Sequence, residues 1–133
     1  MIYLLDTNTC IQYLTGRSSK VINKFKTIAR QDIALCDVVK AELYYRAYKS
    51  SRRDANLALY ELFFNQYISH PFDGKAASIY GQIRSNLEAK GTPIGAYDLQ
   101  IAAIALVYDL ILVTHNIKEF ERIQNLKLED WER

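Results

Sequence analysis

The sequence predicts an α/β protein whose central sheet is parallel and is covered by helices on both faces. Short apolar runs alternate with longer segments of helical periodicity, so strands and helices are expected to alternate along the chain. The runs are apolar at every position rather than at every second one, which is typical of strands buried on both faces. The 133 residues suffice for one core, and we expect a single domain over residues 1–133.

The predicted strands are the short apolar runs. They lie at residues 2–5, 33–36, 67–72 and 110–113, with a last short strand at 126–128. Ligands of open parallel sheets bind beyond the carboxyl ends of the strands, where the strand order reverses. The polar residues that follow these strands are therefore the first candidates for a functional site.

The predicted helices fill the segments between the strands. Apolar residues at helical spacing mark helices from about residue 9, over 21–28, and over 38–48, 53–66 and 74–90. Residues 96–108 are apolar almost all round, which indicates a buried helix, and 91–95 are predicted to be a loop. Thr7 and Asn8 are expected to cap the first helix, and Asp37 the helix over 38–48.

Composition excludes several classes of protein. Half of the residues are apolar and 24% are charged, which is ordinary for a globular chain and excludes disorder. The longest apolar run is far shorter than the ~20 residues that a membrane span needs. No basic segment precedes an apolar one at the N-terminus, so we expect a cytoplasmic protein without membrane association. Cys10 and Cys36 are expected to be buried and unpaired.

The net charge of +2 is unevenly distributed. Residues 17–53 hold ten Lys or Arg against three Asp or Glu. This half of the chain can present a basic face to a polyanion, or it can simply be a solvated helix surface, and charge alone does not decide between the two.

Four polar residues lie at predicted strand ends or helix starts. Asp6 follows the first strand, Glu42 lies in the early turns of the helix after the second, Asp98 is near the start of the buried helix, and Asn116 follows the strand at 110–113. We expect them to converge on one rim of the sheet. Asp98 is the most informative, because a carboxylate among apolar neighbours is costly to bury unless it is paired or binds a metal.

Each of these residues also has a plain structural interpretation. Asp6 and Asp98 can be helix caps, Glu42 can pair with Arg46 one turn on, and Asn116 can be a turn residue. Together they favour another interpretation, because clustered carboxylates repel one another unless a cation neutralises them. Hard divalent cations take oxygen ligands, so an acidic cluster beside a basic half-chain indicates metal-assisted cleavage of phosphodiesters.

Four segments that together span the chain carry a family resemblance. They are DTN at 6–8, Glu42, PIGxxDxxIAA at 93–103, and LVTxNxxEF at 112–120. These segments resemble the PIN domain family, and the closing LxLEDW at 126–131 is similar to the tail of VapC-type toxins. The resemblance implies a three-layer α/β/α sandwich. It also implies an endoribonuclease toxin of a toxin–antitoxin pair that depends on Mg²⁺, with Mn²⁺ as a substitute.

The resemblance assigns roles to individual residues. It makes Asp6 and Asp98 metal ligands, with Glu42 and Asn116 completing the catalytic set. The family often has Asp where this chain has Asn116, so one negative charge is missing, and Glu119 can supply it. The residues expected to donate hydrogen bonds around the metal ligands are Thr7, Asn8 and Thr114.

The resemblance also implies partners. A VapB-type antitoxin is expected to insert a basic side chain among the acids while lying along the helix over 38–48, and the substrate is RNA, with tRNA anticodon loops as candidates. A homodimer is expected too. Tyr44, Tyr45 and Tyr48 can form a protein interface or stack on unpaired bases, and we favour the interface. Candidates for binding RNA phosphates are Arg46, Lys49, Arg52 and Arg53, with a solvated face as the alternative.

Two other functions are weighed. A phosphatase of the haloacid-dehalogenase type also begins with Asp after the first strand, but its second Asp is replaced here by Asn8, which cannot act as an acid. A PIN-fold module that binds RNA or protein with weak catalysis is the second alternative, and cleavage of RNA in the presence of Mg²⁺ would exclude it.

Trp131 is expected at the edge of the core and His115 in a solvent-facing loop.

Overall fold

A five-stranded parallel sheet forms the centre of the protein, which a computed structural model describes over all 133 residues. The strand order is β3-β2-β1-β4-β5. Their bounds are Tyr3–Leu5 (β1), Ile33–Cys36 (β2), Ile68–His70 (β3), Ile111–Val113 (β4) and Leu128–Glu129 (β5). The strand order reverses between β1 and β4, so this is where a functional site is expected.

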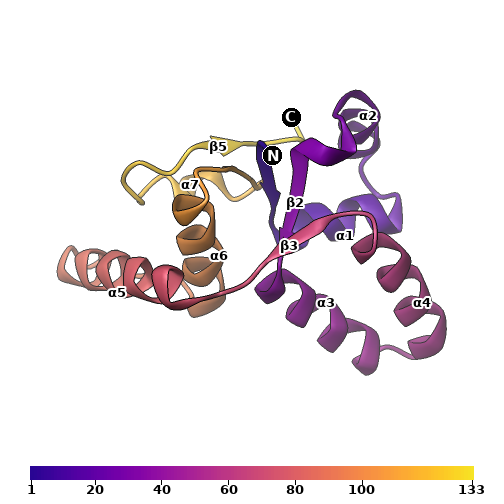
Figure 1. The fold of residues 1–133 in the computed structure, drawn as a ribbon, viewed down its shortest axis with the longest axis horizontal. Coiled ribbons are helices and arrows are strands. Elements are labelled where there is room, and N and C mark those ends of the chain that lie inside the picture. Colours follow the sequence, from indigo (N-terminus) through magenta and orange to yellow (C-terminus); the bar gives the residue numbers. More distant parts are fainter.

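The helices cover the two faces of the sheet. In Figure 1, α1–α4 lie on one side of the strands and α5 and α6 on the other, which confirms the three-layer arrangement. The helices are Thr7–Thr15 (α1), Ser19–Thr27 (α2), Asp37–Lys49 (α3), Arg53–Phe64 (α4), Gly74–Ala89 (α5), Ala96–Val107 (α6) and Ile117–Phe120 (α7), and a 3-10 turn spans Arg30–Asp32. None of them is long and apolar enough to cross a membrane.

One hydrophobic core of 31 buried residues runs through both layers of helices. The residues of β2 are all buried, as the uninterrupted apolar run predicts. Helix α6 is also confirmed as a buried element, with its central residues Ile101–Ala105 inaccessible to solvent. Cys10 and Cys36 lie in this core as free, buried cysteines, as expected.

The ends of two helices differ from the prediction. Helix α1 begins at Thr7, and its N-cap is Asp6, whose Oδ1 accepts the Thr9 N–H at 2.8 Å. Thr7 and Asn8 are therefore helical residues and not caps. Asp37 is the first residue of α3, and its carboxylate instead accepts the hydroxyl of Ser69 at 2.6 Å. Both helices start earlier than expected because the residue that follows each strand already caps or begins the helix: Asp6 caps α1, and Asp37 is the first residue of α3.

The C-terminal segment is tied into the core by Trp131. Its indole is 3% exposed and packs edge-on against Tyr3 and Phe25, with ring centroids 5.3 and 5.4 Å away. Its Nε1–H donates to Glu129 Oε1 at 3.0 Å, so the buried polar atom is paired. This confirms the place predicted for Trp131, and it fixes β5 beside β4.

Candidate active site

Asp6 lies at the point where the strand order reverses, between β1 and β4. Its side chain is buried, and its Oδ1 accepts the Thr9 N–H at 2.8 Å. Burial raises the pKa of Asp6, and the Thr9 N–H and the neighbouring hydroxyl of Thr114 offset part of that rise. One carboxylate oxygen serves the helix cap, so the cap and a site role are compatible in this residue.

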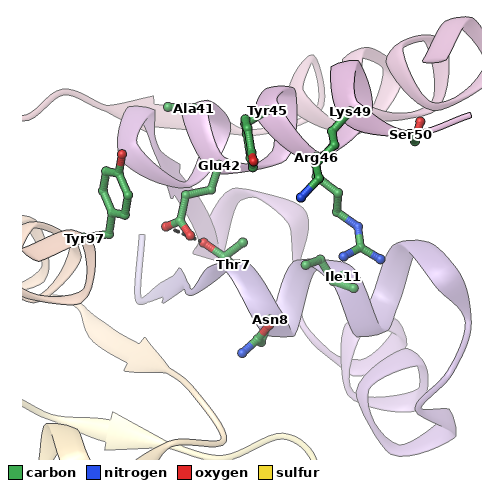
Figure 2. Close-up of a pocket in the computed structure, with 10 residues that line it drawn as sticks. All are labelled: Thr7, Asn8, Ile11, Ala41, Glu42, Tyr45, Arg46, Lys49, Ser50 and Tyr97. Carbon is green, nitrogen blue, oxygen red and sulfur yellow. Dashed lines mark hydrogen bonds between the residues drawn. The ribbon is translucent and has the colours of Figure 1, made fainter. Parts of the chain in front are cut away.

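Glu42 faces Asp6 from the second turn of α3. Its Oε1 accepts the hydroxyl of Thr7 at 2.9 Å, across 35 residues of sequence. Burial raises the pKa of Glu42, the Thr7 hydrogen bond lowers it, and the nearby charge of Asp6 raises it again. The alternative in which Glu42 pairs with Arg46 is wrong, because the carboxylate turns toward α1 (Figure 2).

Asp98 is the third residue of α6 and does not cap it. The N-cap position is Gly95, which has no side chain to offer. Burial, together with the charges of Glu119, Asp6 and Glu42, raises the pKa of Asp98 to about 6. A carboxyl group that responds to three other acids lies in one cluster with them. The structure therefore brings together the three predicted acids and Glu119, the residue expected to supply the charge that Asn116 lacks.

Asn116 and Glu119 form the fourth side of the cluster, where β4 passes into α7. The Asn116 amide donates to Glu119 Oε2 at 2.9 Å, and the Asn116 backbone N–H donates to Thr114 Oγ1 at 3.0 Å. Glu119 thus sits where the sequence suggested a replacement for the charge that Asn116 lacks. Asn116 itself is exposed and holds the Glu119 carboxylate in place.

The three residues expected to donate hydrogen bonds behave differently. Thr7 donates to Glu42 and orients that acid, whereas the hydroxyl of Thr114 lies near Asp6 and lowers its pKa. Asn8 makes no hydrogen bond to any of the acids. It is exposed and lies on the adjoining wall of a groove between α1 and α3 (Figure 2).

A second group of ionisable side chains adjoins the site and was missed by sequence reasoning. Asp130, buried at the end of β5, raises the pKa of Asp6 by its charge. His115 Nδ1 lies 3.0 Å from Asp130 Oδ2 and 3.9 Å from Glu132 Oε2, and Arg133 Nε lies 3.4 Å from Asp130. Because His115 and Arg133 contact the carboxylates of Asp130 and Glu132, we interpret the group as an ion-pair network. The only signal for it in the sequence was the LxLEDW tail.

The groove between α1 and α3 has a volume of about 760 Å³ and opens beside Glu42. Two of the predicted RNA-binding residues, Arg46 and Lys49, line it (Figure 2). Arg52 and Arg53 lie beyond its far end, where Arg53 Nε donates to the Tyr48 carbonyl at 3.2 Å. The four basic residues are thus arranged along and past one groove that begins at the acids.

The donor set of the cluster fits a hard divalent cation. Asp6, Glu42, Asp98 and Glu119 all offer carboxylate oxygens. Burial raises the pKa values of the first three, and the charges of neighbouring acids of the cluster add to the rise in Glu42 and Asp98. No three of the four bring their oxygens within 4.8 Å of one another, unlike the group around Asp130. Mg²⁺ suits such a spacing, because it is usually held by one or two carboxylates and keeps several waters.

The chain belongs to the PIN domain family. The family model described as "PIN domain" matches residues 3–126. Among curated proteins the chain is 39% identical to Ribonuclease VapC2 of Rickettsia felis, over 100% of both sequences. It is also 38% identical to the tRNA(fMet)-specific endonuclease VapC of Salmonella typhimurium, over 97% of both.

Two solved structures share the whole fold. VapBC2 from Rickettsia felis, bound to a DNA fragment from its promoter, matches with a TM-score of 0.91 and 38% identity, over 98% of this chain and 99% of that one. DNA-bound VapBC from Salmonella typhimurium matches with a TM-score of 0.92 and 37% identity, over 98% of both chains. The resemblance read from the sequence to the VapC-type PIN proteins is therefore confirmed.

Proposed function

We propose that the protein is a metal-dependent endoribonuclease that acts as the toxin of a toxin–antitoxin pair. The observation that carries the proposal is the cluster of Asp6, Glu42, Asp98 and Glu119 at the point where the strand order of a PIN-family sheet reverses. The names of the curated relatives, which are ribonucleases and a tRNA(fMet)-specific endonuclease, support the same reaction.

Asp6 and Asp98 are the residues that would hold Mg²⁺, or Mn²⁺ in its place. When bound, the ion polarises water and stabilises charge that develops on phosphate oxygens. Asp6 is positioned for this by the Thr9 N–H, which fixes its carboxylate. Asn116 acts indirectly, by orienting Glu119 beside Asp98.

Glu42 is the residue that would take a proton from the attacking water. Thr7 donates to its Oε1, so Oε2 is left to accept that proton. The pKa of Glu42 is raised from its usual value, which makes its carboxylate a stronger base than an exposed one.

Cleavage of RNA by the purified chain tests the proposal. We expect a structured RNA such as a tRNA to be cut within its loops in millimolar Mg²⁺ or Mn²⁺ and to stay intact in EDTA. DNA of the same sequence is the control for substrate class. An RNA that is bound but left intact with either metal would favour the alternative of a PIN-fold binding module.

An antitoxin of the VapB type is the proposed partner, because similar chains have been solved as VapBC complexes. The four acids suit a basic side chain inserted by such a partner, as the sequence predicted. Tyr44 is the least suited of the three tyrosines to contact it, because its ring packs edge-on against Phe64 at 5.2 Å, whereas Tyr45 and Tyr48 are exposed. A small neighbouring reading frame for a DNA-binding protein would support this partner. The homodimer stays a prediction.

The acids predict a pH dependence of stability in the absence of metal. Because the pKa of Asp98 is about 6 in the folded chain and near 4 in the unfolded one, the folded state binds more protons between these values. The contribution of Asp98 to stability in EDTA is therefore fully present below about pH 4 and is lost as pH rises through about 6. The raised pKa values of Asp6 and Glu42 act in the same direction. Thermal melts of the wild type and Asp98→Asn in EDTA at several pH values measure this dependence. The melting temperature of Asp98→Asn should fall less than that of the wild type as pH rises.

Metal should reverse this loss of stability. A cation that binds only the folded chain adds about 2.7 kcal/mol at one hundred times its Kd, which raises the melting temperature of a chain this size by several degrees. We expect Mn²⁺ to give such a shift at pH 7.5 in the wild type and a much smaller one in Asp6→Ala. Equal shifts in the two proteins would place the metal elsewhere.

A further inference from the structure

One stripe of helix α3 links the acids to the basic half of the chain. Glu42, Tyr45, Arg46 and Lys49 follow one another at the spacing i, i+3, i+4, i+7, which puts them on one face of the helix. Seven residues of helix make this stripe about 10 Å long. It forms one wall of the groove whose other wall is α1 (Figure 2). Figure 2 also shows Tyr97, from the first turn of α6, at the end that holds Glu42.

The charge of this groove changes along its length. Glu42 is the only acid that lines it, and it lies at the end next to the cluster. Arg46 and Lys49 further along have no acidic partner, since neither takes part in a salt bridge. Lys49 Nζ lies 5.7 Å from the centroid of the Tyr45 ring, so a cation and an aromatic face are presented together. The groove is thus built to hold a negatively charged chain that leads into the acids.

Two tyrosines give the groove free aromatic surface. Tyr45 is 66% exposed and Tyr97 is 61% exposed, which is unusual for rings of this size. Figure 2 places them on either side of Glu42. Neither ring stacks on another aromatic side chain. Tyr48 on the same helix differs, because its ring stacks with that of Tyr44 at a centroid distance of 6.5 Å.

We propose that this groove binds an unpaired stretch of the RNA next to the bond that is cut. Bases stack on Tyr97 and Tyr45, and the phosphates that follow pair with Arg46 and Lys49. Base stacking on aromatic side chains needs bases that are splayed out of a helix, so the two tyrosines suit only an unpaired segment. This inference rests on the proposed ribonuclease function and names the residues that hold the substrate beside the same site.

Binding without cleavage tests the groove. The full chain is titrated in EDTA against a fluorescein-labelled short oligouridylate and against a blunt RNA duplex of equal length, with anisotropy as the readout. We expect the single strand to bind more tightly than the duplex. Tyr97→Ala and Tyr45→Ala should each weaken single-strand binding at least about fivefold, as loss of one stacked base predicts. The Phe variants should stay within about twofold of the wild type, because the stacking face is kept.

Matched controls come from the same surface. Tyr48→Ala removes an exposed tyrosine of α3 outside the groove and should leave RNA affinity unchanged. Arg46→Ala and Lys49→Ala should weaken binding and flatten its dependence on salt, since each removes a phosphate contact. Lys75→Ala, on the exposed face of α5, should do neither. Melting temperatures close to that of the wild type would show that the variants are folded.

Several results would overturn the inference. The inference is wrong if the duplex binds as tightly as the single strand, or if the single strand does not bind. It is also wrong if Tyr97→Ala and Tyr45→Ala both keep full affinity for the single strand, or if the Phe variants bind it as weakly as the Ala variants. Full RNA affinity with loss of antitoxin binding in the Ala variants would make the groove a protein site instead. Cleavage is measured separately, with metal. If the wild type cuts RNA and both Ala variants bind RNA normally, the proposed RNA-binding role of the groove is wrong and the ribonuclease function stands. If the wild type binds RNA through both tyrosines but never cuts it, the ribonuclease function is wrong and the RNA-binding role of the groove stands.

Discussion

Asp98→Asn should give a folded protein whose RNA cleavage is reduced by more than about 100-fold. Loss of a group that only supports a metal ligand typically costs 10–100-fold, so loss of a ligand charge should cost at least as much. Asn keeps the shape of the side chain and removes the charge that raises the electrostatic energy of the cluster. The variant should therefore be at least as stable as the wild type in EDTA at neutral pH, because the pKa of Asp98 is raised by burial and by its acidic neighbours.

The matched control for Asp98→Asn is Asp109→Asn. Asp109 is an exposed Asp that pairs with Lys127 at 3.1 Å, and its φ of 52° is one that Asn also tolerates. It should keep full activity. RNA cleavage by Asp98→Asn at a rate close to that of the wild type would remove Asp98 from the metal site. Because Asp98 does not cap α6, loss of activity could not be explained by a damaged helix start.

The parts of the fold that local patterns determine were predictable from the sequence. The apolar run at 33–36 is β2 as observed, and the apolar segment after Gly95 is the buried helix α6. The rule that ligands bind beyond the ends of parallel strands led to Asp6, Glu42 and Asp98 before any geometry was known. The raised pKa values of Glu42 and Asp98 support the predicted cluster, because Glu42 responds to the charge of Asp6, and Asp98 responds to the charges of both. Their roles in catalysis stay proposals.

The individual side-chain contacts between distant segments were not predictable, because no local pattern encodes them. The Thr7–Glu42 hydrogen bond spans 35 residues, whereas the expected Glu42–Arg46 pair was only one turn away and did not form. Asp130 reaches the site because β5 pairs with β4, which one short strand of sequence does not reveal. Helix α7 has four residues, too few for a periodic pattern, although it carries Glu119. Local reasoning found the candidate residues, and the sheet order determined which of them meet.

Trp131→Ala should lower the free energy of unfolding by about 3–5 kcal/mol, the usual cost of truncating a buried Trp. The indole is 3% exposed, although it is the third residue from the C-terminal end, and its removal leaves a cavity against Tyr3 of β1 and Phe25 of α2. It also removes the indole N–H that Glu129 Oε1 accepts, although Lys24 Nζ still lies 3.6 Å from that oxygen. Chemical denaturation measures the change.

Trp131→Phe separates the packing of the tail from its effect on the site. Phe refills most of the cavity, so it should cost clearly less stability than Ala, while Tyr48→Ala, an exposed aromatic, should stay within about 0.5 kcal/mol of the wild type. Asp130 precedes Trp131 and contacts His115 at 3.0 Å, next to the loop that carries Thr114 and Asn116. Trp131→Ala should therefore also loosen this loop and reduce RNA cleavage at temperatures where the variant is still folded. A loss below about 1 kcal/mol would mean that the tail contributes little to the core, and β5 would then not be what holds Asp130 beside Asp6.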